Sequence, residues 1–361
     1  MGIVGRSLIG VALLAAAGTA AVWFFRVQIA ERVFERGAEM NITRNVAEEP
    51  GDGLHVFVCG AGTPMPDPLR GGPCLAVMAG GEFIVIDAGS GGARTLTRMG
   101  YPIGEVDAVF LTHLHSDHMD GLGELLLQVW VNGGRDVPLP VHGPPGVDEL
   151  VNGFNAAYRI DSTYRTAHHG PDIANPAGRG GVPVTISMPA GPGGQAVVYE
   201  SGGVTVTAYR VSHAPVEGAY GYRIDYKGRS VSISGDTIYD PNLVAASRGA
   251  DLLFHEALNR NMVTTLRTAA EGAGREGLVQ IFDDILDYHA TPEDAARSAQ
   301  EADVSRLVYY HTIPPLPQRS LNELFMKDAR ALFDGPMEVA EDGFIYTLPA
   351  DSETIERTKA F

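Results

Sequence analysis

The sequence predicts an α/β fold in which the carboxyl ends of several strands form one site. Short apolar runs recur along the chain, metal-binding residue types follow them, and Gly-rich turns or helical segments separate them. Ligands in open α/β sheets bind at the carboxyl ends of the strands. The runs are "VDAVFLT" before the cluster at His113, "VTVTAYRVSH" ending at His213, "RSVSISGDT" with Asp236, "ADLLFHE" with His255 and Glu256, and "RLVYYHT" with His311.

Residues 1–50 differ in composition from residues 51–361. An uncharged apolar run extends over Ser7–Phe25, with Arg6 before it and Arg26 after it. About 20 apolar residues suffice for one membrane-crossing helix, and the aromatic cluster at the end of this run is typical of a membrane interface. The sequence therefore predicts a signal-anchor helix and linker in 1–50 and a catalytic domain in 51–361. A cleaved signal peptide remains the open alternative.

The predicted location of the catalytic domain follows from that N-terminus. Three arginines follow the apolar run and one precedes it, but glutamates are interleaved with the three. In a bacterial chain, an uncleaved anchor predicts a membrane-anchored domain in the periplasm, and a cleaved one predicts export. We therefore expect membrane contact through the N-terminal helix only.

The charge of the chain argues against polyanionic partners. The sequence contains 27 Lys and Arg against 44 Asp and Glu, which gives a net charge of −17. Residues 1–50 contain equal numbers of Arg and Glu, so the whole excess belongs to the predicted catalytic domain. A field of that sign repels nucleic acids, which are bound through clustered Lys and Arg. We expect a small-molecule substrate and consider nucleic acid an unlikely partner.

The elements of the predicted catalytic domain follow one another with clear turn signals. After a linker at 47–53, "LHVFVCG" predicts a strand that ends in a Gly-rich turn. "CLAVMA" and "EFIVIDAG" predict a hairpin, because Gly80 and Gly81 join them. "GARTLTRM" predicts a helix that ends at Gly100. The next apolar run then leads directly into the histidines.

Two later segments do not fit the strand pattern. The stretch 152–203 is rich in Gly, Pro and Ala, which predicts either a binding loop or lid, or a surface excursion. Its aromatic and basic residues favour a substrate-facing role: Phe154, Tyr158, Arg159, Tyr164, Arg165, His168 and His169. The stretch 259–287 predicts one or two helices before His289.

The cysteines, Cys59 and Cys74, are too few for a disulfide framework or a thiolate zinc site. The number of cysteines therefore favours a pair of buried thiols. Whether they form a disulfide bond is left open by the sequence.

The stretch "THLHSDHMDG" contains three of the eleven histidines of the chain. In an extended strand end, residues two apart face the same way, so His113 and His115 can present imidazoles to one cation. A turn at Ser116 would bring Asp117 and His118 to a second, adjacent position. Imidazole and carboxylate suit Zn²⁺, and a shared carboxylate such as Asp236 would hold two metals about 3.5–4 Å apart.

This stretch resembles the signature of the metallo-β-lactamase superfamily, and the resemblance extends over about 54–348. It implies an αββα four-layer sandwich with two Zn²⁺ ions. It also implies a ligand set: His113, His115 and His213 for the first metal, Asp117, His118 and His311 for the second, and Asp236 bridging both. Asp87 in "IDAG" matches the family's carboxylate that steadies ligand histidines.

Further motifs resemble the ribonuclease Z and arylsulfatase-like branch of that superfamily. These are "CGAGTPMP", "FHEAL" and "HATPEDAA". The resemblance implies that Glu256 and His289 assist the leaving group while Asp117 orients a metal-bridging hydroxide. Thr291 as N-cap and Pro292 in the first turn predict a helix directly after His289.

The predicted function is that of a dinuclear zinc hydrolase acting on a small phosphodiester or sulfate ester. The alternatives are hydrolysis of β-lactams or lactones, and a ribonuclease Z-type endoribonuclease. An iron-dependent oxygen chemistry is disfavoured because di-iron relatives have Glu where this chain has His115. A scaffold without activity is disfavoured because the ligand set is complete. A homodimer is left open.

Overall fold

The computed structural model describes residues 18–43, 51–191 and 193–361. The contacts within the chain define two units, Met1–Asn45 and Val46–Phe361.

The smaller unit contains the helix α2, Arg26–Thr43. Residues 18–24, which precede this helix, are also helical. Charged residues are interleaved with apolar ones along α2, and Arg32 pairs with Glu35 at 3.1 Å. Among the described residues, no helix is long and apolar enough to cross a membrane. This finding contradicts the predicted membrane anchor and the periplasmic or exported location. Residues 7–17 of the predicted run lie outside the described residues.

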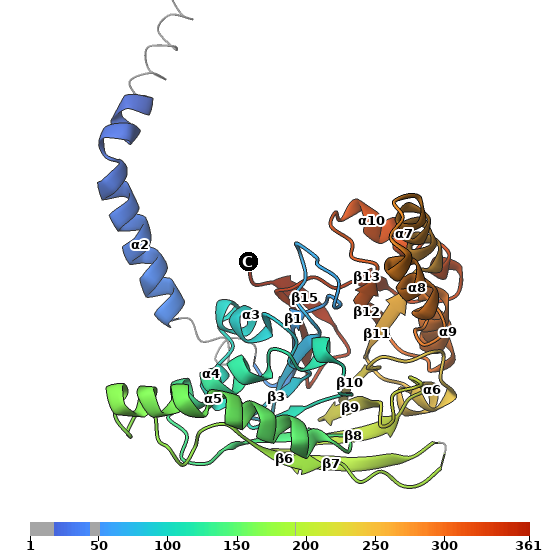
Figure 1. The fold of residues 1–361 in the computed structure, drawn as a ribbon, viewed down its shortest axis with the longest axis horizontal. Helices are drawn as coiled ribbons and strands as arrows, with labels where there is room; N and C mark the ends of the chain where they lie inside the picture. Colours follow the sequence, from blue (N-terminus) through green and yellow to red (C-terminus); the bar gives the residue numbers. More distant parts are fainter. Residues whose placement is uncertain (1–17, 44–50, 192) are drawn as a thin grey trace, which may run out of the picture. The chain divides into compact units, whose positions relative to one another are not determined.

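The larger unit is built on two sheets (Figure 1). The eight-stranded sheet has the order β15-β14-β1-β2-β3-β4-β5-β6, and the seven-stranded sheet has the order β13-β12-β11-β10-β9-β8-β7. The strands of the first are β1 Gly53–Gly60, β2 Cys74–Ala79, β3 Glu82–Ile86, β4 Ala108–Phe110, β5 Leu139–Gly143, β6 Gly181–Thr185, β14 Phe344–Pro349 and β15 Glu356–Lys359. Those of the second are β7 Gln195–Ser201, β8 Val204–Arg210, β9 Tyr220–Tyr226, β10 Arg229–Ile233, β11 Leu252–Leu258, β12 Arg306–Ile313 and β13 Met337–Val339.

Helices cover the outer faces of both sheets. One buried core joins the two sheets and contains residues such as Val56 and Val77 from the first, and Val206 and Ile224 from the second. A second core lies between the first sheet and the helices α3 Gly92–Met99, α4 Leu122–Gly133 and α5 Val147–His169. A third packs the second sheet against α6 Pro241–Ala246, α9 Pro292–Glu301 and α10 Ser320–Phe325. The predicted α/β sandwich of four layers is thus confirmed.

The local sequence signals are mostly confirmed. β2 and β3 form an antiparallel hairpin, with Gly80 and Gly81 at φ of 61° and 85° in the turn. α3 ends at Gly100. α9 begins with Thr291 as N-cap in a capping box with Asp294. The helices expected before His289 are α7 Arg260–Gly272 and α8 Glu276–Asp284. Short 3₁₀ turns lie at Ile103–Glu105, Ser116–His118 and Ala329–Ala331.

The stretch 152–203 is not the loop that its composition predicted. Most of its first part belongs to α5, a helix of 23 residues, and β6 and β7 follow it. Val147 and Val151 anchor α5 in the core, so a sparse apolar stripe is enough to fix the helix. The Gly and Pro residues that suggested a loop lie mainly after Gly170.

Cys59 and Cys74 form a disulfide bond between β1 and β2, so the favoured expectation of two free thiols was wrong. These strands are antiparallel neighbours, and Gly60 pairs with Cys74 in the register. The pairing of the strands brings the two cysteines together, and sequence separation alone could not establish this.

Candidate metal centre

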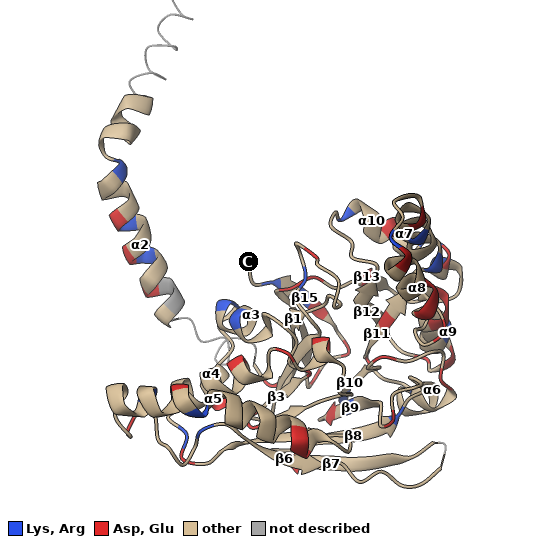
Figure 2. Ribbon diagram, viewed as in Figure 1, with Lys and Arg blue, Asp and Glu red and all other residues tan. Residues whose placement is uncertain are grey.

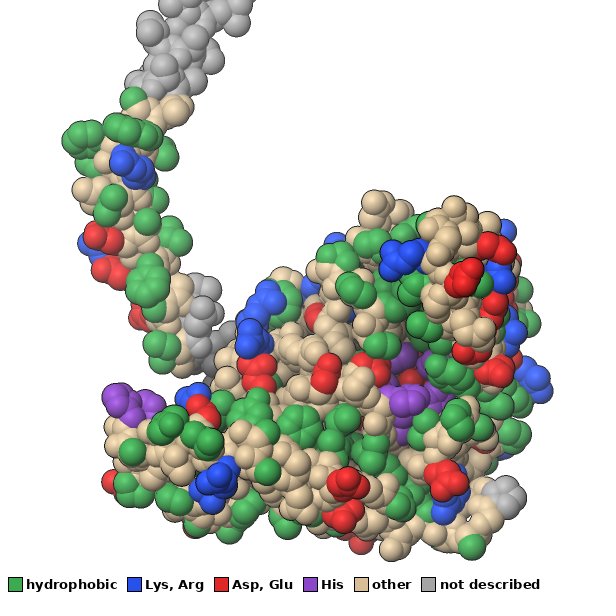
Figure 3. All heavy atoms as spheres, in the orientation of Figure 1, with side chains coloured by type: hydrophobic (Ala, Val, Ile, Leu, Met, Phe, Trp, Pro, Cys, Tyr) green, Lys and Arg blue, Asp and Glu red, His purple; other side chains and the backbone are tan. Residues whose placement is uncertain are grey.

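The predicted ligands gather at one edge of the sandwich because their strands point the same way. β3, β4, β5 and β6 are parallel in the first sheet, and β10, β11, β12 and β13 are parallel in the second. β8 also points this way, since it and β10 are both antiparallel to β9. The space-filling view shows histidine side chains in a hollow between the outer helices (Figure 3).

The first group of ligands consists of His113, His115 and His213. His113 Nε2 lies 3.0 Å from His115 Nδ1, and His213 Nε2 lies 3.3 Å from the same His115 atom. His113 follows β4 and His213 follows β8, so the group joins the two sheets. Three ring nitrogens therefore face one point.

The second group consists of Asp117, His118 and His311. The 3₁₀ turn Ser116–His118 turns the chain back so that Asp117 and His118 face the site together. Asp117 Oδ2 lies 3.2 Å from His311 Nε2 and 3.6 Å from His118 Nε2. His311 lies inside β12 rather than after it, and its backbone has a positive φ of 45°. Such strain in a residue other than Gly is typical of functional sites.

Asp236 lies between the two groups. Its Oδ1 is 3.3 Å from His118 Nε2, and its Oδ2 is 3.8 Å from His113 Nε2 and 3.5 Å from His311 Nε2. One carboxylate thus lies close to both groups: Oδ2 is near a member of each, and Oδ1 is near the second group. This is the arrangement expected of a carboxylate that bridges two cations.

The buried polar atoms of this cluster fit a bound metal. Among the described residues, His118 Nε2 and Asp236 Oδ1 are buried without a hydrogen-bond partner. Unpaired buried polar atoms are costly, so they call for a partner such as an ion. Donated hydrogen bonds also fix the ring tautomers: His118 Nδ1 donates to Asp87 at 2.8 Å, and His213 Nδ1 donates to the Tyr288 carbonyl at 2.9 Å. In both rings Nε2 is left with a free lone pair.

The electrostatics favour neutral imidazoles in the first group. Burial lowers the pKa of His113 well below its usual value and that of His213 to about 4. Burial acts in the same direction on His118, but Asp236 and Asp87 outweigh it and raise the pKa of His118. The first group therefore offers neutral ligands, whereas the second lies in a strongly negative field.

Glu256 and His289 lie beside the second group. His289 Nδ1 donates to Glu256 Oε1 at 3.1 Å and lies 4.0 Å from Asp236 Oδ2. The same Glu256 oxygen accepts the backbone N–H groups of Thr237 and Ala290. Burial, followed by the charge of Asp236, raises the pKa of Glu256 well above its usual value. This pair can therefore hold a proton next to the metal ligands.

The pairing of β11 with β12 shifts its register at Glu256, between His255 and Ala257. Glu256 faces the metal ligands, whereas His255 belongs to none of the described groups that could hold a metal. His255 Nδ1 instead bonds the Glu256 carbonyl. Adjacent strand residues point to opposite faces, so only one of the two can enter the site.

The sequence interpretation missed two contacts that support the ligands. Thr112 donates its Oγ1–H to Asp87 Oδ2 at 2.9 Å and lies 3.1 Å from His113 Nδ1. The carbonyl of Tyr288 holds His213. The first contact could have been predicted, because Thr112 lies directly before the histidine motif. The contact of His213 with the Tyr288 carbonyl could not, because any residue type provides a backbone carbonyl.

Comparison with known proteins identifies a matching family and similar proteins. Residues 83–312 match a family described as a Beta-lactamase superfamily domain. A protein named ribonuclease Z from Mycobacterium avium (strain 104) is 35% identical over 291 residues, which is 80% of this chain and 96% of that protein.

Solved structures share the fold. The human tRNase Z short form matches with a TM-score of 0.57 at 23% identity, over 82% of this chain and 99% of that chain. Zn²⁺-bound PqqB from Methylobacterium extorquens matches with a TM-score of 0.51 at 16% identity, over 81% of this chain and 99% of that chain.

The predicted absence of nucleic acid partners is wrong, because relatives at this identity are named ribonucleases. The error was to treat a net charge of −17 as if it were the local field at a binding site. The family match and the length of the alignment with the relatives together establish the family of this chain. The chain belongs to the metallo-β-lactamase superfamily and is a metal-dependent hydrolase of the branch whose curated relatives are named ribonuclease Z.

Proposed function

We propose that residues 51–361 form a zinc-dependent endoribonuclease of the ribonuclease Z type, which hydrolyses a phosphodiester bond in RNA. The observation that carries this proposal is the pairing of Asp236 with both ligand groups while Glu256 and His289 lie next to it. The 35% identity to ribonuclease Z over 96% of that protein supports RNA as the substrate.

Two Zn²⁺ ions fit the donor set. His113, His115 and His213 would hold the first, and Asp117, His118 and His311 the second, with Asp236 shared. Imidazole and carboxylate are ligands that zinc prefers, and a superfamily relative of similar fold is described as zinc-bound. When bound, such ions act as Lewis acids and make a water-derived nucleophile available near neutral pH.

Asp117 would orient the attacking water. Its Oδ2 faces His311 and lies next to Asp236 in the same pocket of ligands. A carboxylate in this position accepts a hydrogen bond from the water and directs its oxygen lone pair toward phosphorus.

Glu256 and His289 would supply the proton that the leaving oxygen needs. When the bond between phosphorus and the leaving oxygen breaks, that oxygen takes up one proton, while the water oxygen becomes bonded to phosphorus. Glu256 fixes the Nδ1–H of His289, which leaves His289 Nε2 to exchange the proton. Burial and the charge of Asp236 raise the pKa of Glu256, which favours a proton held by this pair.

A small phosphodiester or sulfate ester is the second candidate substrate. The net charge of −17 favours it, because the overall field opposes the approach of a polyanion. Both substrates would use the same ligands, so the assay has to compare substrates on the same preparation.

The test is a cleavage assay on the zinc-loaded protein with three substrates. These are a transfer-RNA transcript extended at its 3′ end, bis(p-nitrophenyl) phosphate and p-nitrophenyl sulfate. We expect endonucleolytic cleavage of the transcript, and loss of cleavage on adding a chelator. Hydrolysis of the two small esters without cleavage of the transcript would overturn the ribonuclease proposal.

The variant His289→Ala tests the role of the proton donor. We expect cleavage of the RNA to fall by about 10²–10⁴-fold, as for loss of a general acid. The p-nitrophenolate leaving group needs little protonation, so hydrolysis of bis(p-nitrophenyl) phosphate should fall much less. An equal loss on both substrates would contradict the assigned role.

A further inference from the structure

A pocket of about 320 Å³ lies between α4, α5 and the turn before β6. That volume is at the lower end of the range of about 300–1,000 Å³ in which small ligands bind. Asn155 fixes the pocket's geometry, because its side chain accepts from Gly181 N and donates to Gly181 O. The pocket is therefore preformed between fixed elements.

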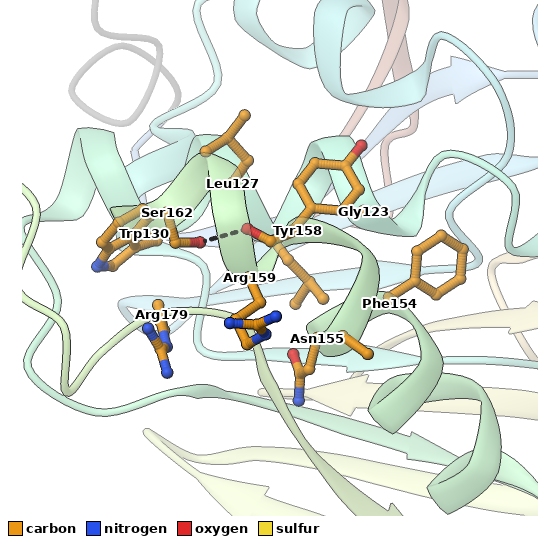
Figure 4. Close-up of a pocket in the computed structure, with 12 residues that line it drawn as sticks. Gly123, Leu127, Trp130, Phe154, Asn155, Tyr158, Arg159, Ser162 and Arg179 are labelled. Carbon is orange, nitrogen blue, oxygen red and sulfur yellow. Dashed lines mark hydrogen bonds between the residues drawn. The ribbon is translucent and has the colours of Figure 1, made fainter. Parts of the chain in front are cut away.

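Aromatic side chains and two arginines line this pocket (Figure 4). Phe154 and Tyr158 project from α5 beside Gly123 of α4. A Cβ at Gly123 would collide with the ring of Tyr158, so the glycine allows this close approach. Arg159 of α5 and Arg179 of the turn before β6 line another part of the pocket. The pocket thus combines aromatic rings with the positive charges of two arginines.

The two arginines are not neutralised by the protein. Within the described residues, neither Arg159 nor Arg179 takes part in an ion pair or a side-chain hydrogen bond, and both are exposed. By contrast, Arg165 on the same helix pairs with Asp161 at 2.7 Å. In a chain of net charge −17, two unpaired arginines at one pocket attract an anion. By contrast, acidic residues, red in Figure 2, outnumber basic ones on α8 and α9.

The helix α4 connects the pocket to the metal-binding motif along the chain. α4 begins four residues after His118, and its first turn contributes Gly123 to the pocket. Leu114 and Phe154 pack against the same hydrophobic core. A substrate strand that leaves the metal centre along α4 would therefore reach the rings of α5 first.

We propose that this pocket binds a nucleotide of single-stranded RNA next to the cleavage site. Phe154 and Tyr158 stack on the base, and Arg159 and Arg179 contact the adjacent phosphates. Stacking on aromatic rings with basic residues along the backbone is how proteins bind single strands without sequence preference. This inference rests on the proposed ribonuclease function, whose substrate it locates.

The test measures the binding of a fluorescein-labelled, phosphorothioate-linked single-stranded RNA to the zinc-loaded full chain by anisotropy at several salt concentrations. For the double variant Arg159→Gln/Arg179→Gln, we expect Kd to rise about tenfold. The slope of log Kd against log salt should fall by about 1 to 1.5, because each lost phosphate contact contributes about 0.7. Tyr158→Leu should raise Kd at least about fivefold, whereas Tyr158→Phe keeps the ring and should leave it unchanged.

The charge-matched control is Arg248→Gln/Arg275→Gln, which removes two exposed arginines outside the pocket. This control should bind RNA like the parent chain. Equal weakening in both double variants would overturn the proposal, as would parent-like binding in Arg159→Gln/Arg179→Gln. A change of sedimentation coefficient in the pocket variant without a change in RNA binding would assign this surface to a subunit contact instead, and would also overturn it.

These measurements distinguish a failure of the pocket proposal from a failure of the proposed ribonuclease function. Hydrolysis of bis(p-nitrophenyl) phosphate should be unchanged in all pocket variants, because the pocket residues do not touch the ligand groups. RNA bound in the pocket but not cleaved by the parent chain would contradict only the ribonuclease proposal. RNA cleaved normally by the pocket variants would contradict only the pocket.

Discussion

Of the two ligand groups that share Asp236, one consists of three imidazoles and the other contains a carboxylate. In the first group, His115 is the least buried member, and a backbone carbonyl holds His213. In the second, His118 is fully buried and Asp87 holds its ring. The two clusters suited to metal binding thus differ, since one is more open and neutral and the other is closed and negatively charged. We expect the second group to hold its metal more tightly than the first.

The largest effect should come from removing the element common to both groups. Asp236→Ala should lower zinc content from two per chain to below one. It should reduce hydrolysis of every substrate by at least about a thousandfold, because the metals supply several kcal/mol of transition-state stabilisation. Zinc analysis and steady-state kinetics measure this. Retention of two zinc ions in this variant would show that Asp236 is not shared.

Replacing one ligand in each group should show how the two groups differ in their contribution to stability. His115→Ala and His118→Ala should each lower zinc content to about one and reduce activity by about a hundredfold or more. Only His118→Ala should also lower the free energy of unfolding, by about 1–3 kcal/mol, because Asp87 then loses a buried partner. Denaturant unfolding of the two variants checks the difference, and equal stability would contradict it.

Asp87→Asn should lower the metal affinity of the second group and leave that of the first group unchanged. Loss of a partner of a ligand histidine costs about 10–100-fold in metal affinity. Because Asp87 bonds His118 and not His213, the affinity loss should appear only for the second metal. A chelator titration that resolves the two zinc ions measures this. A loss shared by both ions would show that the groups are not supported independently.

The smallest effect should come from Thr112, whose hydroxyl contacts Asp87 and His113. Thr112→Ser keeps the bonds to Asp87 and His113 and should leave activity and stability unchanged. Thr112→Val removes them, and it should lower the free energy of unfolding by about 1–3 kcal/mol with less than about a tenfold loss of activity. Thermal unfolding of both variants at equal zinc concentration provides the measurement.

The sequence predicted much of the site because its signals are local. The spacing of His113, His115, Asp117 and His118 depends only on a strand end and one turn, and the structure has both. The capping box at Thr291 and the hairpin at Gly80 are also local. Such features follow from backbone geometry within a few residues.

Three of the failed predictions depended on sums or averages over long segments. A total charge of −17 suggested no RNA partner, although Arg159 and Arg179 line a pocket without an acidic partner. The composition of 152–203 suggested a loop, whereas α5 needs only a narrow apolar stripe to form. The apolar count over Ser7–Phe25 suggested an anchor, and no described helix can span a membrane.

The sequence by itself determined which residue types could bind metal and where each lies relative to its strand. Only the tertiary structure decided that Asp236 touches both groups, that Glu256 enters the site while His255 leaves it, and that Cys59 meets Cys74. The physical reason is register. A side chain's direction alternates along a strand, so a shift of one residue in pairing reverses which face it reaches. That pairing is fixed by contacts between segments far apart in the chain.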